Sequence, residues 1–214
     1  LVNVGCLGIL RKEEIIYGNA KREDDLLIYV GSKTGNEGIG GAAMASQSFT
    51  NNIDMNKLQD NVQKSDPFLE KLLLEACCEI AKKSCVSGMQ DMGAGGLLCA
   101  SLEVVLRGRD KTCENFGCSI HLDKVPTKYE MEPSNILISE SQERMLIVSP
   151  PENKEKIFEI FEKWELEYSV IGSVNTSGEY KVYNYGEILY KEKITNFKDI
   201  TDNRYSLDEK PILH

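Results

Sequence analysis

The stretch from Gln90 to Ala100, QDMGAGGLLCA, constrains the fold more than any other part of the chain. In it, Asp91 comes just before three glycines in four positions, and two leucines follow the last glycine directly. Glycine inside a helix or strand costs about 0.5–1 kcal/mol relative to alanine, so this cluster indicates a backbone that bends tightly or lies against another group. Two interpretations are open: a buried turn between strand and helix, which the pattern alone favours, or a loop whose N–H groups hold a phosphate.

The residues around these glycines predict a strand, a turn and a helix. The following stretch, LLCASLEVVLRG at 97–108, has helical spacing and ends at Gly108. Asp91 is therefore expected at the end of a strand, with the first turn of a helix immediately behind the glycines. A carboxylate placed there can bind a divalent cation while the helix N-terminus holds an anion, and this placement favours a functional role for Asp91.

The clearest helix begins at Asp66, whose side chain can cap the free N–H groups, and at Pro67, which suits the first helical position. Apolar residues then recur at the spacing of a helix that lies on a core, at Leu69, Leu72, Leu73, Ala76, Cys77 and Ile80. A second amphipathic helix is expected in ENKEKIFEIFEKWELE at 152–167, with Ile157, Ile160, Phe161 and Trp164 facing inward.

Strands are expected in LVNVGCLGIL at 1–10, in 24–32, in CSIHLDKVP at 118–126 and in VIGSV at 170–174, and a hairpin around Asn184-Tyr185-Gly186. The segment 131–151 is expected to contain a short helix, the stretch SESQER and the strand RMLIVS. Helices and strands alternate irregularly, which predicts an α+β fold: a mixed sheet with flanking helices. Glu140-Ser141-Gln142 combines a carboxylate, a hydroxyl and an amide before a buried strand, and a solvated turn is the ordinary interpretation of such residues.

The composition excludes some classes of partner. The formal net charge of −9 argues against nucleic acid, because phosphate backbones bind basic surfaces. No apolar run reaches the roughly 18 residues that span a bilayer, so no membrane partner is expected. Seven cysteines without CxxC pairs indicate reduced thiols and a cytoplasmic location, with Cys77, Cys78 and Cys99 as core residues.

Five segments in order resemble the small-type phosphoribosylformylglycinamidine synthases: VQKSDPFLEKLLLEAC, QDMGAGGL, HLDKVP, EPSNILISESQERMLIV and VIGSV. The resemblance covers about residues 1–200. Aminoimidazole ribonucleotide synthetase and selenophosphate synthetase, from the same superfamily, lack this combination of SESQER and DPFLEK. Because the chain starts without methionine, in a strand-like run, we expect it to be a piece of a longer protein.

The resemblance implies a fold like the C-terminal α+β domain of the aminoimidazole ribonucleotide synthetase superfamily. Residues 1–24 would end a preceding N-terminal domain, 25–178 would form the α+β domain, and 179–214 a hairpin and linker toward a second unit. The implied reaction belongs to purine biosynthesis: ATP-dependent amidation of formylglycinamide ribonucleotide to formylglycinamidine ribonucleotide. The implied partners are a glutaminase subunit and a small third subunit.

The resemblance also assigns site residues. Asp91 would bind magnesium (Mg2+), with ATP as co-substrate, and Gln63, Glu140, Ser141 and Gln142 would contact the substrate. The catalytic histidine of the family and most of its ATP contacts would lie outside this chain, so no catalytic residue is assigned here and the isolated chain is expected not to turn over.

The glycine-rich segment departs from the family pattern: it reads TGNEGIGGA where TGRDGIHGA is usual. Asn36-Glu37 replaces an arginine–aspartate pair and Gly40 replaces a histidine, so we assign this loop no site role. Two other functions stay open: a catalytically silent module for subunit contact, and another ligase or kinase of the same superfamily.

Overall fold

The computed structural model describes residues 5, 7–39, 64–112 and 114–197. Its helices, 3-10 turns included, are η1 (Lys12–Glu14), α3 (Pro67–Lys83), α4 (Gly96–Thr112), η2 (Leu122–Lys124), α5 (Pro133–Ile138), η3 (Pro151–Asn153), α6 (Lys154–Lys163) and η4 (Ile194–Phe197). Its strands are β1 (Leu26–Gly31), β2 (Gly88–Asp91), β3 (Gly117–His121), β4 (Arg144–Ser149), β5 (Tyr168–Asn175), β6 (Glu179–Asn184) and β7 (Glu187–Lys193).

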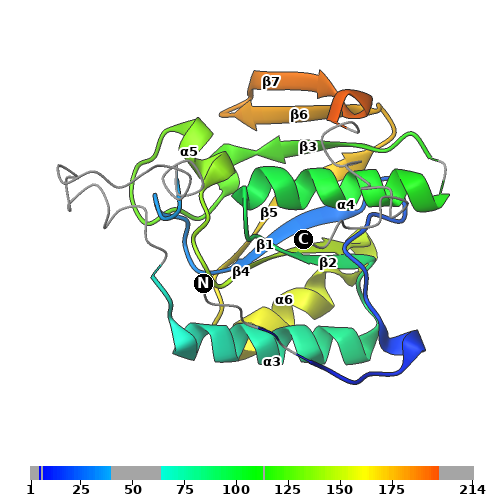
Figure 1. Ribbon diagram of the computed structural model, residues 1–214, viewed down its shortest axis with the longest axis vertical. Helices are drawn as coiled ribbons and strands as arrows, with labels where there is room; N and C mark the ends of the chain where they lie inside the picture. Colours follow the sequence, from blue (N-terminus) through cyan, green and yellow to red (C-terminus); the bar gives the residue numbers. More distant parts are fainter. Residues whose placement is uncertain (1–4, 6, 40–63, 113, 198–214) are drawn as a thin grey trace, which may run out of the picture.

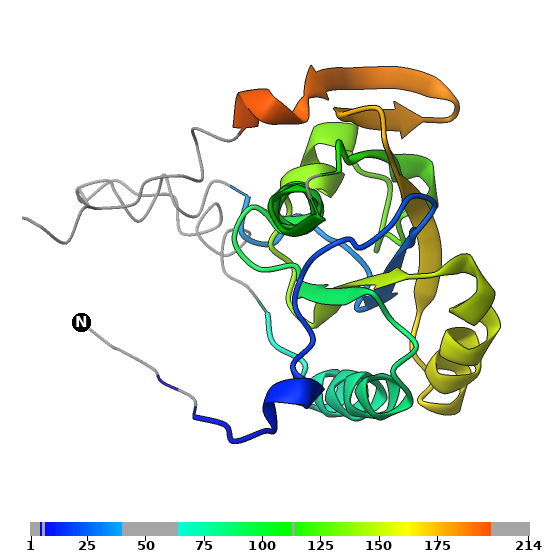
Figure 2. The ribbon, with the colours of Figure 1, turned by 90° about the vertical axis from the view of Figure 1, so that its right-hand side faces the viewer.

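The strands form one seven-stranded mixed sheet in the order β2-β4-β1-β5-β3-β6-β7. Only β3 and β6 pair in parallel among the described strands, and the other neighbours are antiparallel. Helices α4 and α5 cover one face of the sheet, while α3 and α6 lie side by side on the other (Figures 1 and 2). The predicted α+β fold, a mixed sheet with flanking helices, is confirmed.

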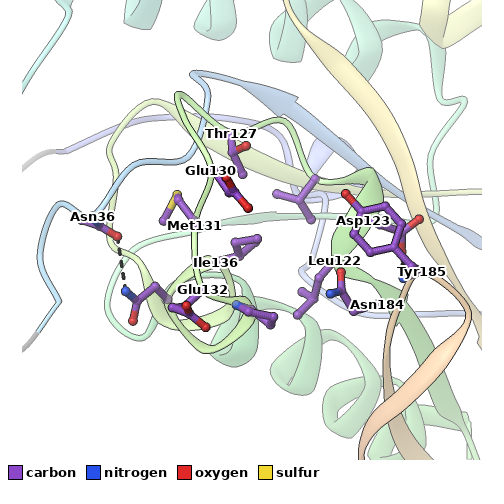
Figure 3. Close-up of a pocket in the computed structure, with 13 residues that line it drawn as sticks. Asn36, Leu122, Asp123, Thr127, Glu130, Met131, Glu132, Ile136, Asn184 and Tyr185 are labelled. Carbon is purple, nitrogen blue, oxygen red and sulfur yellow. Dashed lines mark hydrogen bonds between the residues drawn. The ribbon is translucent and has the colours of Figure 1, made fainter.

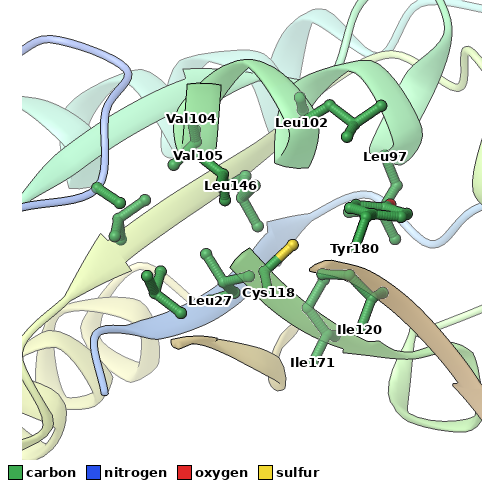
Figure 4. Close-up of a cluster of buried hydrophobic side chains, with 14 of the residues drawn as sticks. Leu27, Leu97, Leu102, Val104, Val105, Cys118, Ile120, Leu146, Ile171 and Tyr180 are labelled. Carbon is green, nitrogen blue, oxygen red and sulfur yellow. The ribbon is translucent and has the colours of Figure 1, made fainter. Parts of the chain in front are cut away.

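The central strand β1 contributes side chains to the hydrophobic cores on both faces of the sheet, because successive side chains of a strand point to opposite faces. Leu27 and Tyr29 belong to the core under α4, whereas Ile28 and Val30 belong to the core under α3 and α6. Figure 4 shows the first of these cores, with α4 lying across the sheet. The buried Tyr180 hydroxyl lies 2.9 Å from Ser101 Oγ, so its polar end is paired within this core.

Several elements begin or end where the sequence predicts. Asp66 Oδ1 accepts hydrogen bonds from the N–H groups of Phe68 and Leu69, at 3.1 and 3.0 Å, and caps α3 as expected. Strand β2 ends at Asp91, and α4 begins at Gly96 and continues to Thr112, beyond the predicted end at Gly108.

Other predictions are wrong. Of the strand expected at 1–10, residues 1–4 and 6 lie outside the described residues; residues 7–10 form no strand, and Leu7 and Ile9 are almost fully exposed. The helix expected at 152–167 is shorter, since α6 ends at Lys163, but Trp164 still packs partly against the core under α3 and α6 as expected, and its indole N–H donates to Glu79. The strand expected at 118–126 ends at His121, where η2 begins.

The cysteine prediction is wrong in part. Cys78 and Cys99 are exposed rather than core residues, whereas Cys77 packs partly against the core under α3 and α6. Consecutive helical residues lie about 100° apart around the axis, so Cys77 and Cys78 cannot both face the sheet. None of the described helices is long and apolar enough to cross a membrane.

Candidate functional site

The glycine turn lies against the SESQER segment at 139–144. Gly95 and Gly96 have φ angles of +71° and +55°, which side chains with a Cβ rarely adopt. A Cβ on Gly96 would also lie 2.0 Å from the carbonyl oxygen of Ser139, a contact that no side chain can make. The glycines therefore allow both the tight bend between β2 and α4 and the close approach of the two backbones.

Glu140 lies over this turn. Its carboxylate Oε1 accepts a hydrogen bond from the N–H of Gly95 at 3.1 Å, and its Cβ would be 2.5 Å from a Cβ added to Gly38. The negative charge is thus placed at the N-terminus of α4, where the helix dipole and the free N–H groups favour an anion.

Asp91 and Gln142 line one pocket of about 280 Å³, although they come from separate parts of the sequence. Asp91 is exposed at the end of β2, and its Oδ1 accepts a hydrogen bond from Gln90 Nε2 at 3.1 Å. The Gln142 amide donates to the carbonyl of Glu140 at 3.2 Å. Other residues that line the pocket are Glu70, Leu73, Leu74, Cys77, Met92, Gly93, Glu143, Arg144 and Met145.

Ser141, in contrast, is buried and faces away from this pocket toward the loop at 34–38. Its Oγ accepts the N–H of Gly35 at 2.9 Å, lies 3.1 Å from Ser139 Oγ and donates to the carboxylate of Glu37. The structure therefore brings Asp91, Glu140 and Gln142 together around the glycine turn, with Ser141 anchored behind them. Gln63 lies outside the described residues.

Arg144 is the last residue of the SESQER segment and is 3% exposed, so burial lowers the pKa of its guanidinium. It donates to the carbonyls of Ser141 and Ser139, at 2.6 and 2.5 Å, and to Thr34 Oγ1 at 3.0 Å. Arg144 is not among the site residues expected from the sequence. An arginine that opens the apolar strand RMLIVS is the signal that would have identified it, because a buried arginine needs acceptors on several sides.

Asp91 could bind magnesium as a single carboxylate ligand, though not as part of a cluster of protein ligands among the described residues. Within the described ranges, no group of three or more His, Cys, Asp or Glu side chains is arranged to hold a metal ion. Mg2+, however, usually binds through one or two carboxylates and fills its remaining positions with water and substrate phosphates. A single exposed carboxylate that opens into a pocket suits this second kind of site.

A larger pocket of about 610 Å³ lies elsewhere, between α5, η2 and the β6–β7 turn (Figure 3). Its lining includes three carboxylates, Asp123, Glu130 and Glu132, and the amides of Asn36 and Asn184. No arginine, lysine or histidine lines it, so an anionic ligand would meet only repulsion from its charged groups. The smaller pocket is also lined by three carboxylates, Glu70, Asp91 and Glu143, but Arg144 lines it as well, so it is the better candidate for a phosphorylated ligand.

The profile of the AIR synthase related protein family, C-terminal domain, matches residues 22–184. The chain belongs to this family. As a domain of the AIR synthase related family, it resembles curated proteins named phosphoribosylformylglycinamidine synthase subunit PurL. The protein from Campylobacter hominis is 49% identical over 188 residues, and that from Nitratiruptor is 48% identical over 188 residues. These matches cover 87% of this chain and 25% and 24% of the relatives, so the chain spans about a quarter of their length.

Solved structures agree with this assignment. Thermotoga maritima PurL complexed with FGAR matches at a TM-score of 0.77 and 36% identity, over 87% of this chain and 30% of that chain. The same protein complexed with ATP matches at a TM-score of 0.71, over 87% of this chain and 27% of that chain. The T. maritima PurLQS structure also matches at a TM-score of 0.71, over 86% of this chain and 28% of that chain. The family resemblance predicted from the sequence is confirmed. The domain boundaries predicted at 24 and 178 stay a prediction.

Proposed function

We propose that this chain is part of a phosphoribosylformylglycinamidine synthase, a ligase of purine biosynthesis that converts formylglycinamide ribonucleotide to formylglycinamidine ribonucleotide. Support comes from relatives of that name at 48–49% identity and from similar structures with FGAR and with ATP bound. In this reaction ATP phosphorylates the amide oxygen, and ammonia from glutamine then displaces phosphate from the same carbon. ADP and phosphate leave.

The observation that carries this proposal is the shared pocket of Asp91 and Gln142. In the proposal Gln142 and its neighbours Glu140 and Ser141, together with Gln63, contact the ribonucleotide. The amide of Gln142 supplies both donors and an acceptor, which suits ribose hydroxyls and phosphate oxygens.

Asp91 would hold magnesium in the same pocket, with water and ligand phosphates as its other ligands. Bound there, the ion would neutralise charge on phosphate oxygens during phosphoryl transfer. We assign binding and orientation to the residues of this chain, and proton transfer to none of them.

The proposed assembly includes a glutaminase subunit and a small third subunit, in line with the T. maritima structure named PurLQS. We also propose a cytoplasmic location. The five cysteines within the described ranges are free thiols, which suits a reducing compartment.

The test is a calorimetric titration of the chain with formylglycinamide ribonucleotide and Mg2+. We expect Gln142→Ala to weaken binding by about tenfold or more, because it removes hydrogen bonds to a charged ligand. Asn184→Ala, an amide truncation in the larger pocket, is the matched control and should bind like wild type. Loss of binding in Asn184→Ala but not in Gln142→Ala would show that the ligand binds in the larger pocket. No binding by wild type would contradict the proposal that this chain binds the ligand by itself.

A further inference from the structure

The loop at 34–38 is tied to the SESQER segment by backbone and side-chain contacts together. The N–H of Gly35 donates to Ser141 Oγ at 2.9 Å, and Ser139 Oγ donates to the carbonyl of Gly35 at 2.6 Å. The N–H of Glu140 donates to the carbonyl of Glu37 at 2.9 Å. Three successive residues of the candidate site segment therefore take their position from this loop.

The carboxylate of Glu37 lies at the centre of these contacts. One oxygen accepts from Ser141 Oγ, and the other pairs with Lys128 Nζ at 2.5 Å. The side chain is 13% exposed and folds back over its own loop, so that a Cβ on Gly35 would lie 2.4 Å from Glu37 Oε2. Glycine at position 35 is thus what allows this carboxylate to reach Ser141.

The carboxylate is held in its ionised form. Burial acts to raise its pKa, but the hydrogen bonds from Lys128 and Ser141 outweigh burial, and the pKa of Glu37 is lowered. An ionised acceptor makes a stronger hydrogen bond to a hydroxyl than a neutral one does. Ser141 is therefore held by a charge-assisted bond.

Arg144 also holds this segment, through the carbonyls of Ser139 and Ser141, and it contacts the loop as well through Thr34 Oγ1. The segment is thus fixed at its backbone by Arg144 and at a side chain by Glu37. If Glu37 loses its charge, the bonds from Arg144 and from the backbone of the loop remain, so the fold should persist while Ser141 is held less firmly and Gln142 is aimed less precisely.

We propose that Glu37 is a positioning residue, which fixes Ser141 and thereby aims the neighbouring Gln142 into the pocket that it shares with Asp91. The inference rests on the proposed function of that pocket as a ribonucleotide site. It gives a role to a residue at which the chain departs from the usual family pattern, where a shorter aspartate occupies this place.

The test compares Glu37→Gln, which removes the charge and keeps the shape, with Glu37→Asp, which keeps the carboxylate. Glu159→Gln is the charge-matched control, because Glu159 is an exposed carboxylate that lines neither pocket and has no ion pair in the part of the chain that the structure describes. Two measurements are made on the full chain: amide hydrogen exchange at 139–142 without ligand, and calorimetric affinity for formylglycinamide ribonucleotide with Mg2+.

Glu37→Gln should speed exchange at 139–142 and weaken binding about tenfold, while its melting temperature stays close to wild type. Glu37→Asp should restore most of the affinity, which a merely structural defect would not do. Unchanged exchange and affinity in Glu37→Gln would overturn the inference. If wild type binds no ligand, the proposed function fails for this chain, and exchange alone decides the positioning role: faster exchange supports it and unchanged exchange overturns it.

Discussion

The Glu140 carboxylate accepts a hydrogen bond from the backbone N–H of Gly95, with Oε1 at 3.1 Å from the nitrogen. This N–H belongs to the glycine turn directly before α4, the place where the sequence allowed either a phosphate cradle or a simple turn. The anion found at this helix N-terminus is a side chain of the protein itself. The turn therefore joins the metal candidate Asp91 to the predicted substrate segment.

The first prediction concerns this contact. Glu140→Ala should destabilise the chain by about 1 kcal/mol, because it removes both an acceptor for a helix N-terminal N–H and a favourable charge. Glu140→Gln keeps an acceptor and should lose less. Urea unfolding followed by circular dichroism measures both free energies, and a Glu140→Gln variant as stable as wild type would contradict a role for the charge.

The second prediction concerns Gly96. Gly96→Ala combines a positive φ angle with a Cβ only 2.0 Å from the Ser139 carbonyl oxygen, so we expect a loss of about 3 kcal/mol or more. Gly186→Ala is the matched control, since its φ is +84° but its Cβ would meet nothing within 4 Å. It should lose only about 1 kcal/mol. Similar losses in thermal melts of the two variants would mean that the clash is relieved by movement of the backbone.

The third prediction concerns Arg144. Arg144→Met has a similar volume but leaves the carbonyls of Ser139 and Ser141 and the Thr34 hydroxyl without their donor. We expect a loss of about 3 kcal/mol in denaturant unfolding, because buried acceptors that lose a charged partner are costly. A loss below about 1 kcal/mol would indicate that water replaces the guanidinium.

The fourth prediction is a pH dependence. Hydrogen bonds from Lys163, Lys83 and Trp164 lower the pKa of Glu79 from 4.5 to about 2. A depressed folded-state pKa gives stability that is fully present above about pH 4.5 and is lost as the pH falls toward about 2. The melting temperatures of wild type and Glu79→Gln should thus differ at pH 6 and converge near pH 2.

The matched control for this effect is Glu159→Gln on the exposed side of α6. It should track wild type across the whole pH range, because Glu159 makes no ion pair among the described residues. A constant difference between wild type and Glu79→Gln from pH 6 to pH 2 would rule out the proposed linkage.

The fifth prediction concerns two neighbouring cysteines. Burial raises the pKa of the Cys77 thiol to about 12, whereas Cys78, the next residue of α3, is exposed. Because the thiolate is the reactive form, iodoacetamide at pH 8 should modify Cys78 well before Cys77. Mass spectrometry of native chain and of chain unfolded in urea gives both rates. Equal rates in the native chain would show that α3 opens faster than the reagent reacts.

The sequence by itself determined features that depend on neighbouring residues. The start of α3 follows from Asp66-Pro67, because the cap and the ring restrict only the adjacent backbone. The β6–β7 hairpin follows from Tyr185-Gly186, both of which have positive φ angles as a tight turn requires. The position of Asp91 between a strand and a glycine turn is local in the same way, and the structure has it there.

Only the tertiary structure decided which distant segments meet. The sheet places β1 between β4 and β5, and no local pattern encodes that order. Ser141 and Glu37 are 104 positions apart, yet their bond turns the Ser141 hydroxyl away from the pocket and leaves Gln142 to line it with Asp91. Hydrophobic periodicity shows which face of an element is buried, but it does not identify the partner. Which elements pack together was decided by core packing, by the close approach of backbones at glycines and by the pairing of buried charges.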